Sequence, residues 1–367
     1  MENKKNLIVV GGGAAGMMAA IIAARAGAAV TLIEHNEKLG KKLFITGKGR
    51  CNLTNMTNSE MHLSCVVSNP KFLLSAEKGF DASATVAFFE DLGLQVKVER
   101  GNRVFPVSDH SSDVIRALEY ECKRLGVAIR LHTSAKEILT EPIDAPEPEA
   151  GKAETEKAEN SVPDKYAKKS KKKKPVRNAK VVGIKTDKGE ILETEGLILA
   201  TGGVSYPLTG SDRSGLVMAE HTGHQVTDLY PALVPLLTDD PLVPPMAGLS
   251  LRNIKATVMQ EKKVLYEEFG EMLFTHKGFS GPVILSASSF ITSRLAKKGE
   301  SLRLVVDLKP ALTEEVLDKR LQRELESART KQLKNMMSTL LPQSLIGCVL
   351  QKAGIDPDRK ACDIKKE

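Results

Sequence analysis

A glycine-rich turn between two apolar runs constrains the fold of this chain more than any other feature. Residues 7–10 are all apolar and lead directly into the turn, residues 11–16. An Ala-, Ile- and Met-rich segment follows, and a second apolar run, residues 28–33, ends at Glu34. This order predicts a strand, a tight turn, a helix and a second parallel strand, the first part of an α/β sheet.

The glycines and the acid each have a physical role in such a unit. Gly11, Gly13 and Gly16 match G-x-G-x-x-G: the first permits a sharp exit from the strand, the second lets a pyrophosphate approach the backbone, and the third lets the helix pack closely. The N-terminus of the helix offers N–H groups to phosphates. Glu34 stands where the ribose-binding acid is expected and disfavours a 2′-phosphate, so we expect FAD or NAD rather than NADP.

The composition narrows the class of protein. The five cysteines are odd in number and form no C-x-x-C pair, which predicts reduced thiols in a cytoplasmic protein rather than a disulfide framework. No apolar run approaches the length of a membrane span. Tryptophan is absent and aromatic residues make up 4%, so no stacking surface for nucleic acid is indicated.

A low-complexity segment, residues 141–178, interrupts the chain. It is rich in Pro, Glu, Lys and Ala, acidic at first, and then carries a lysine block at 168–174. Such a composition cannot bury enough apolar surface to offset its ordering entropy, so we expect a disordered insertion. The lysines fit either a tether to nucleic acid or anionic lipid, or a solvated loop; we favour the loop and do not expect nucleic acid as a partner.

The loop after Glu34 is the second functional candidate. Residues 36–58 predict an extended loop rich in Gly, Lys, Arg and Asn. Its cationic and amide side chains, Lys42, Lys48, Arg50 and Asn52, suit a loop that lies along a pyrophosphate or a flavin edge, whereas the alternative is a basic surface loop.

The remaining elements complete the first domain. We expect helices near 71–77, 82–92 and 111–125, a strand at 127–131, and hairpin strands at 135–139, 181–186 and 190–193. Residues 196–200 return to the main sheet and end at Thr201 and Gly202, a second point of nucleotide contact that favours FAD over NAD.

Beyond residue 205 the pattern changes to clustered prolines and short strands at 253–258, 263–266 and 301–307, followed by a charged helical end. His276, in the glycine-containing segment 270–282, is a weak candidate for a catalytic residue, and a hydrogen-bonded loop histidine is the alternative. His221 and His224 have no third ligand, so we expect no metal site.

Several of these segments together resemble a known family, the BaiN-type FAD-dependent oxidoreductases. The matching segments are 10–16 (VGGGAAG), 45–55 (ITGKGRCNLTN), 101–106 (GNRVFP), 199–203 (LATGG), 206–211 (YPLTGS), 231–236 (PALVPL) and 270–282 (GEMLFTHKGFSGP). The resemblance covers nearly the whole chain outside 141–178.

The resemblance implies non-covalently bound FAD and a set of contact residues. The pyrophosphate would lie on Gly11, Gly13, Ala14, Ala15 and Gly16, and the ribose on Glu34. The flavin side would be lined by Lys42, Gly49, Arg50, Cys51 and Asn52, with Ala135 near the adenine and Thr201 and Gly202 near the cofactor.

The chain departs from the family pattern in two places. Relatives have GSTGDG where residues 210–215 are GSDRSG. Relatives also carry a later G-E-x-x-D and G-G-Y-N segment that covers the flavin, and no such run occurs here. We therefore expect either a truncated chain or a natural short form, with weaker flavin binding in both cases and an activity that is open.

The pattern and the resemblance together predict an α/β fold. A Rossmann-like FAD-binding domain with a parallel sheet, helices and a β-hairpin layer spans 1–204, an inserted β-rich substrate-side domain spans 205–308, and a helical segment spans 309–367.

Three functions stay open at this stage. The first is an enzyme that reduces an electron-poor C=C bond of a small molecule, such as a steroid- or bile-acid-like enone, or an oxidase variant. With a single G-x-G-x-x-G, NADH or NADPH would dock only transiently as hydride donor. The others are a truncated or non-catalytic flavoprotein and a flavoprotein tethered to nucleic acid. The oligomeric state is left open.

Overall fold

The computed structural model describes residues 4–143, 178–298 and 301–364, and the chain divides into two units, Met1–Thr227 and Asp228–Glu367. The division follows helix α7 (Ser214–His221), which packs on strand β7 of the first unit and so adds residues beyond 204 to that unit. A separate domain for 309–367 stays a prediction. The expected disordered insertion at 141–178 lies, apart from its ends, outside the described residues.

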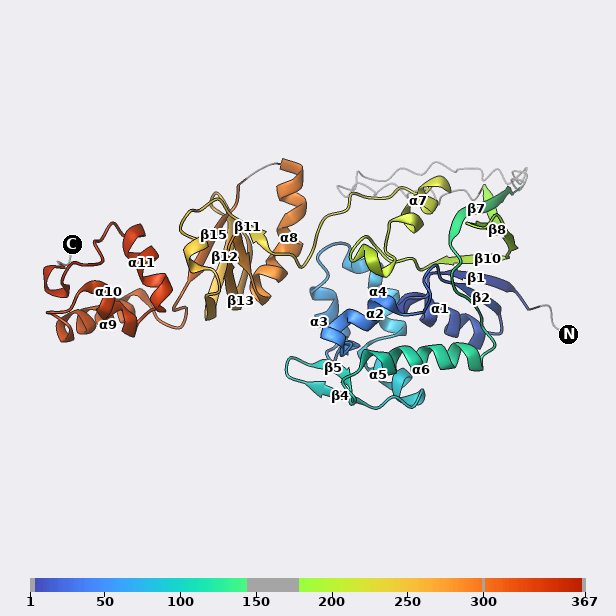
Figure 1. Cartoon of the computed structure of the whole chain (residues 1–367), viewed down its shortest axis with the longest axis horizontal. Helices are drawn as coiled ribbons and strands as arrows, with labels where there is room; N and C mark the ends of the chain where they lie inside the picture. The colour runs from blue at the N-terminus through green and yellow to red at the C-terminus, as the bar shows by residue number, and fades with distance from the viewer. Residues whose placement is uncertain (1–3, 144–177, 299–300, 365–367) are drawn as a thin grey trace, which may run out of the picture. The chain divides into compact units, whose positions relative to one another are not determined.

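A four-stranded parallel sheet in the order β10-β1-β2-β6 forms the centre of the first unit, and Figure 1 labels β10, β1 and β2. Its strands are β1 (Asn6–Val10), β2 (Ala29–Ile33), β6 (Ala128–Arg130) and β10 (Gly196–Leu199). Val10 at the end of β1 lies opposite both Ile33 and Leu199, so three strands end together. The strands are apolar because both faces of the sheet are covered.

The alternation of side chains along β1 explains the two covering layers. Val9 faces one side, where it packs with Met17 and Leu118 of helices α1 (Ala14–Arg25) and α6 (Ser111–Arg124). Ile8 faces the other side and packs with Ile184 of the hairpin layer. That layer consists of β7 (Ala135–Pro142), β8 (Ala179–Thr186) and β9 (Ile191–Glu193). The predicted Rossmann-like fold with a β-hairpin layer is confirmed.

The segment after Glu34 differs from the expected extended loop. Residues 41–49 form a short helix, α2 (Lys41–Ile45), and a 3₁₀ turn (Thr46–Gly49). Gly40 enters the helix with a φ of 71°, its carbonyl accepts a hydrogen bond from the Phe44 N–H, and Leu43 packs against the core. The prediction of a loop was wrong because the packing of Leu43 against the core stabilises a short helix despite the glycines and lysines of this segment.

Smaller elements surround this centre. They are a three-stranded antiparallel sheet of β3 (Thr54–Asn55), β5 (Arg103–Pro106) and β4 (Val96–Glu99), and helices α3 (Ser59–Ser64), α4 (Pro70–Gly79) and α5 (Ala82–Asp91).

The second unit contains a five-stranded antiparallel sheet, covered by helix α8 (Pro282–Lys298), and a helical end. The strands, in sheet order, are β11 (Leu236–Leu237), β14 (Gly278–Ser280), β13 (Lys263–Thr275), β12 (Ser250–Gln260) and β15 (Arg303–Asp307). The helical end contains α9 (Glu314–Ser327), α10 (Leu333–Met336) and α11 (Gln343–Lys352).

Gly16 is expected to be indispensable for folding. A Cβ atom at Gly16 would lie 1.7 Å from the Gly11 carbonyl oxygen, whereas a Cβ atom at Gly13 would meet nothing within 4 Å. Gly16→Ala should therefore lower the free energy of unfolding by about 3 kcal/mol or more through overpacking against backbone. Gly13→Ala, measured by the same denaturant titration, is the matched control and should stay within about 1 kcal/mol of the parent.

Glu121 of α6 should make stability depend on acid pH. Its buried carboxylate is bound by Arg124 and by Arg25 of α1, at 2.6 Å from each, and these guanidinium groups, Arg124 foremost, lower the pKa of Glu121 to about 2. A lowered pKa stabilises the fold above pH 4.5, and this contribution is lost as the pH falls from 4.5 towards 2.

We expect Glu121→Gln to be less stable than the parent by about 2 kcal/mol at pH 6, and we expect this difference to shrink as the pH falls to 3, because only the parent loses the Glu121 contribution. Glu119→Gln, at a half-exposed position paired with Lys123, is the control. Parallel stability curves for the parent and Glu121→Gln between pH 6 and 3 would contradict this linkage.

Candidate functional site

A cavity of about 320 Å³ lies at the carboxyl ends of the parallel strands. Its walls include the residues that end β1 and β2, Val10 and Ile33, and those that follow β10, Ala200 and Thr201. Ligands of open α/β sheets bind at this edge, where strand ends and helix N-termini converge.

The N-terminus of α1 opens into the cavity. Gly13 is the residue before the helix, no side chain accepts a hydrogen bond from the first turn, and that turn contains no acid. Ala14 and Ala15 are exposed and line the cavity. The open space at the Gly13 Cβ position admits a ligand to the backbone. Unpaired N–H groups and the helix dipole make this an anion site.

Glu34 stands beside this helix as a buried carboxylate held by the protein. Its Oε2 accepts a hydrogen bond from the Gly12 N–H at 2.6 Å. Its Oε1 accepts two from Asn36, through the backbone N–H and the side-chain Nδ2, each at 2.8 Å. His35 Nδ1 lies 3.5 Å from the same oxygen. These donors fix the orientation of the carboxylate, which keeps further lone pairs for ligand hydroxyl groups.

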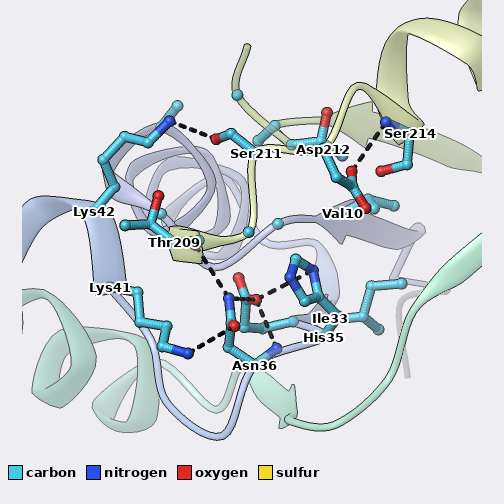
Figure 2. A pocket seen from close by; sticks show the side chains of 18 of the residues that line it. Val10, Ile33, His35, Asn36, Lys41, Lys42, Thr209, Ser211, Asp212 and Ser214 are labelled. Atoms are coloured by element: carbon cyan, nitrogen blue, oxygen red, sulfur yellow. Dashed lines mark hydrogen bonds and ion pairs between the residues drawn. The ribbon is translucent and has the colours of Figure 1, made fainter. Parts of the chain in front are cut away.

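A distant segment, the 202–213 loop, closes the opposite wall. Lys42 Nζ donates a hydrogen bond to Ser211 Oγ, and Asn36 Nδ2 donates to the Thr209 carbonyl at 3.3 Å (Figure 2). Asp212 accepts from the Ser214 N–H at 3.0 Å, and hydrogen bonding by the Ser214 side chain holds the pKa of Asp212 below its usual value. The loop is thus attached to the first βαβ unit by polar contacts.

A second, smaller cavity of about 180 Å³ shares Ala14 and Leu43 with the first and is lined almost entirely by apolar side chains. Cys51 and Asn52 lie in its wall. Burial raises the pKa of the Cys51 thiol, which therefore stays protonated at neutral pH.

Arg50 points to a carboxylate cluster. Its guanidinium binds Glu99 and Asp109, each at 2.5 Å, and its carbon lies 4.1 Å from the ring centre of Phe105. The side-chain hydrogen bond to Arg50 is the largest factor lowering the pKa of Glu99, whereas that of Asp109 is lowered first by Lys97 and then by Arg50. These contacts join the turn after α2 to the β3-β5-β4 sheet.

The structure brings most of the expected site residues together. Those that line the first cavity are Gly11, Gly13, Ala14, Ala15, Glu34, Lys42, Ala135, Thr201 and Gly202. Cys51 and Asn52 line the second cavity, whereas Gly16, Gly49 and Arg50 line neither. His276 is an exposed turn residue between β13 and β14 of the second unit.

Sequence reasoning missed several lining residues. His35 and Asn36 directly follow the β2 acid, so their place at a strand end was a usable signal. Thr209 and Ser211 belong to a segment that matched a family motif but carried no assigned role, and Asp212 lies where the chain departs from the family pattern. Only the tertiary contacts bring these residues to the cavity.

Within residues 4–143, 178–298 and 301–364, no group of three or more His, Cys, Asp or Glu side chains is arranged to hold a metal ion. Among the helices of these same residues, none combines the length and apolar character needed to cross a bilayer.

The cavity at the strand ends, together with the uncapped N-terminus of α1 and the buried Glu34 carboxylate, is typical of a dinucleotide-binding α/β protein. Sequence comparisons identify the family. Residues 5–162 match the HI0933-like protein Rossmann domain, and residues 230–367 match the HI0933-like protein barrel and H2TH domain. The chain therefore belongs to the HI0933-like family, the BaiN group of FAD-dependent oxidoreductases, which confirms the resemblance noted from its motifs.

Three proteins to which the chain is similar represent two activities. The chain is 30% identical over 339 residues to a 3-dehydro-bile acid delta(4,6)-reductase of Clostridium scindens, covering 92% of this chain and 72% of the relative. It is 28% identical over 338 residues to a ribosomal RNA dihydrouridine synthase of Escherichia coli, covering 91% and 70%. The corresponding synthase of Haemophilus influenzae is 24% identical over 344 residues, covering 93% and 73%.

Proposed function

We propose that this chain holds the adenosine and pyrophosphate part of FAD in the first cavity. The open N-terminus of α1 would bind the pyrophosphate through Gly13, Ala14 and Ala15, and Lys42 would add a positive charge. Glu34 would accept hydrogen bonds from the ribose hydroxyls. The residues fit this group for two reasons. The space beside Gly13 is open, so a pyrophosphate can approach the backbone there, and no side chain caps the N–H groups at the start of α1.

We further propose that the reaction is the reduction of an electron-poor C=C bond, in an enone of steroid or bile-acid type, with NADH or NADPH as a transient hydride donor. The observation that carries this proposal is the 30% identity to the bile acid reductase across 92% of the chain. Bound FAD supplies two-electron hydride transfer, the chemistry that such a reduction needs.

The chain's own residues would bind and orient in this reaction. The loop 202–213 and helix α2, joined through Lys42 and Ser211, would keep water from the pyrophosphate side. The apolar second cavity with its protonated Cys51 thiol lies next to this region. No side chain is assigned as the acid or base.

A second candidate substrate is a uracil base in RNA. The C5=C6 bond of uracil is conjugated to a carbonyl, so the same reduction applies, and two of the characterised relatives are ribosomal RNA dihydrouridine synthases. A third alternative is a flavin-dependent oxidase of a small amine or ketone, in which O₂ would reoxidise the reduced flavin.

Removal of the Glu34 carboxylate should weaken FAD binding. Glu34→Gln places an amide against the Gly12 N–H and loses the charged acceptor, so we expect the Kd for FAD to rise at least about tenfold. The quenching of FAD fluorescence on binding measures this directly. Glu37→Gln, at an exposed position three residues on, is the control and should leave the Kd unchanged. An equal Kd for Glu34→Gln and the parent would remove Glu34 from the site.

The proposed reaction predicts a definite redox behaviour. FAD-loaded protein should be bleached anaerobically by NADH or NADPH and should recover its yellow colour on addition of 4-androstene-3,17-dione, with a saturated product detected by mass spectrometry. A second arm replaces the steroid by an unmodified ribosomal RNA fragment and assays dihydrouridine. Recovery with RNA alone would favour the second candidate, recovery only with O₂ would favour an oxidase, and protein that does not bind FAD would refute the proposal.

A further inference from the structure

The 202–213 loop has an inner and an outer part. Gly202 and residues 209–212 line the first cavity, whereas residues 203–208 lie outside its lining. Residues 202–208 are exposed without exception. Apolar side chains recur in this outer part: Val204 is 44%, Tyr206 67% and Leu208 94% exposed. The outer part therefore presents apolar surface next to the cavity wall.

The backbone that carries Tyr206 and Leu208 is held in a turn by the loop's own hydrogen bonds. The Tyr206 carbonyl accepts from the Thr209 N–H at 2.9 Å and from Thr209 Oγ1 at 2.7 Å, and the Gly210 N–H donates to the Pro207 carbonyl at 2.9 Å. The far end is attached through the Lys42–Ser211 hydrogen bond. An exposed apolar group on a fixed turn loses little entropy when it binds a ligand.

The backbone at Tyr206 is also unusual. Its φ is 54°, in the left-handed region that non-glycine residues rarely adopt. Such strained residues concentrate at ligand-binding sites, where the surrounding structure maintains them.

The Tyr206 side chain combines an apolar ring with a hydroxyl group that can donate a hydrogen bond. Among the described residues, its hydroxyl group makes no hydrogen bond to protein. Leu208 adds purely apolar surface two residues further on. An apolar ligand body with a carbonyl group is the chemistry that this pair complements, since the phenol O–H can donate to the carbonyl while both side chains cover the hydrocarbon.

We propose that the outer part of the 202–213 loop binds the substrate: Tyr206 donates a hydrogen bond to the carbonyl oxygen of an apolar ketone, and Leu208 contacts its hydrocarbon body. This inference rests on the proposed enone reduction and names the residues that select its substrate. Both side chains bind and orient the substrate, and neither of them transfers a proton.

The test measures ligand binding without turnover. Equilibrium dialysis of 4-androstene-3,17-dione and of 2-cyclohexen-1-one against protein with oxidised FAD, and no reductant, gives a Kd for each. Tyr206→Phe should raise both values about fivefold, because one hydrogen bond is lost. Leu208→Ala should raise the steroid value by a similar factor and leave cyclohexenone unchanged, because the small ring does not extend to Leu208.

Matched controls come from exposed residues elsewhere in the first unit. Tyr120→Phe removes a hydroxyl from a tyrosine that is 70% exposed on α6, and Phe72→Ala removes an aromatic group that is 85% exposed on α4. Neither should change a Kd. The FAD affinity and the rate of flavin reduction by NADH should also stay at parent values in Tyr206→Phe and Leu208→Ala.

The outcomes separate this inference from the proposed function. Enone reduction by the parent together with unchanged Kd values in both variants would overturn the inference alone. Binding that depends on Tyr206 and Leu208 without any enone reduction would overturn the proposed function alone. A fall in Tm for Leu208→Ala without a change in Kd would show that Leu208 packs against protein, and would also overturn the inference.

Discussion

The close contact between Gly16 and the Gly11 carbonyl is the constraint on which the rest of the first unit depends. A side-chain carbon at Gly16 would lie 1.7 Å from that oxygen, and one at Gly11 would lie 2.5 Å from the Ala200 carbonyl oxygen. These two missing side chains let α1 begin directly at the ends of β1 and β10. The same geometry brings the unpaired N–H groups of the helix to the sheet edge, so packing and ligand recognition have one origin.

Electrostatics at this edge follow from that arrangement. The helix N-terminus attracts an anion, while the buried Glu34 carboxylate is oriented by Gly12 and Asn36 and stays available to hydroxyl groups. The attached 202–213 loop then completes the wall and presents Tyr206 and Leu208 outward. The cavity proposed for the cofactor thus lies beside exposed apolar side chains, the arrangement that the proposed reduction of an apolar ketone requires.

Arg50 and Leu43 show which features local sequence patterns do not predict. Both belong to a segment whose glycines and lysines predict a loop, yet Leu43 packs into the core and so stabilises a short helix. Arg50 binds Glu99 and Asp109, which lie about 50 and 60 residues further along the chain. Whether Arg50 contacts a cofactor or forms a structural ion pair depends on partners that are distant in sequence. The motif that contains Arg50 therefore does not predict its role.

The sequence by itself determined the βαβ unit, the acid at the end of β2, the hairpin layer and the family, because strand and helix periodicity and glycine requirements are local properties. Only the tertiary structure decided which other side chains share the cavity. His35, Thr209 and Ser211 come from segments almost 180 residues apart, and the contacts of Lys42 and Asn36 with the 202–213 loop unite them. Such contacts arise from chain packing, which no local pattern records.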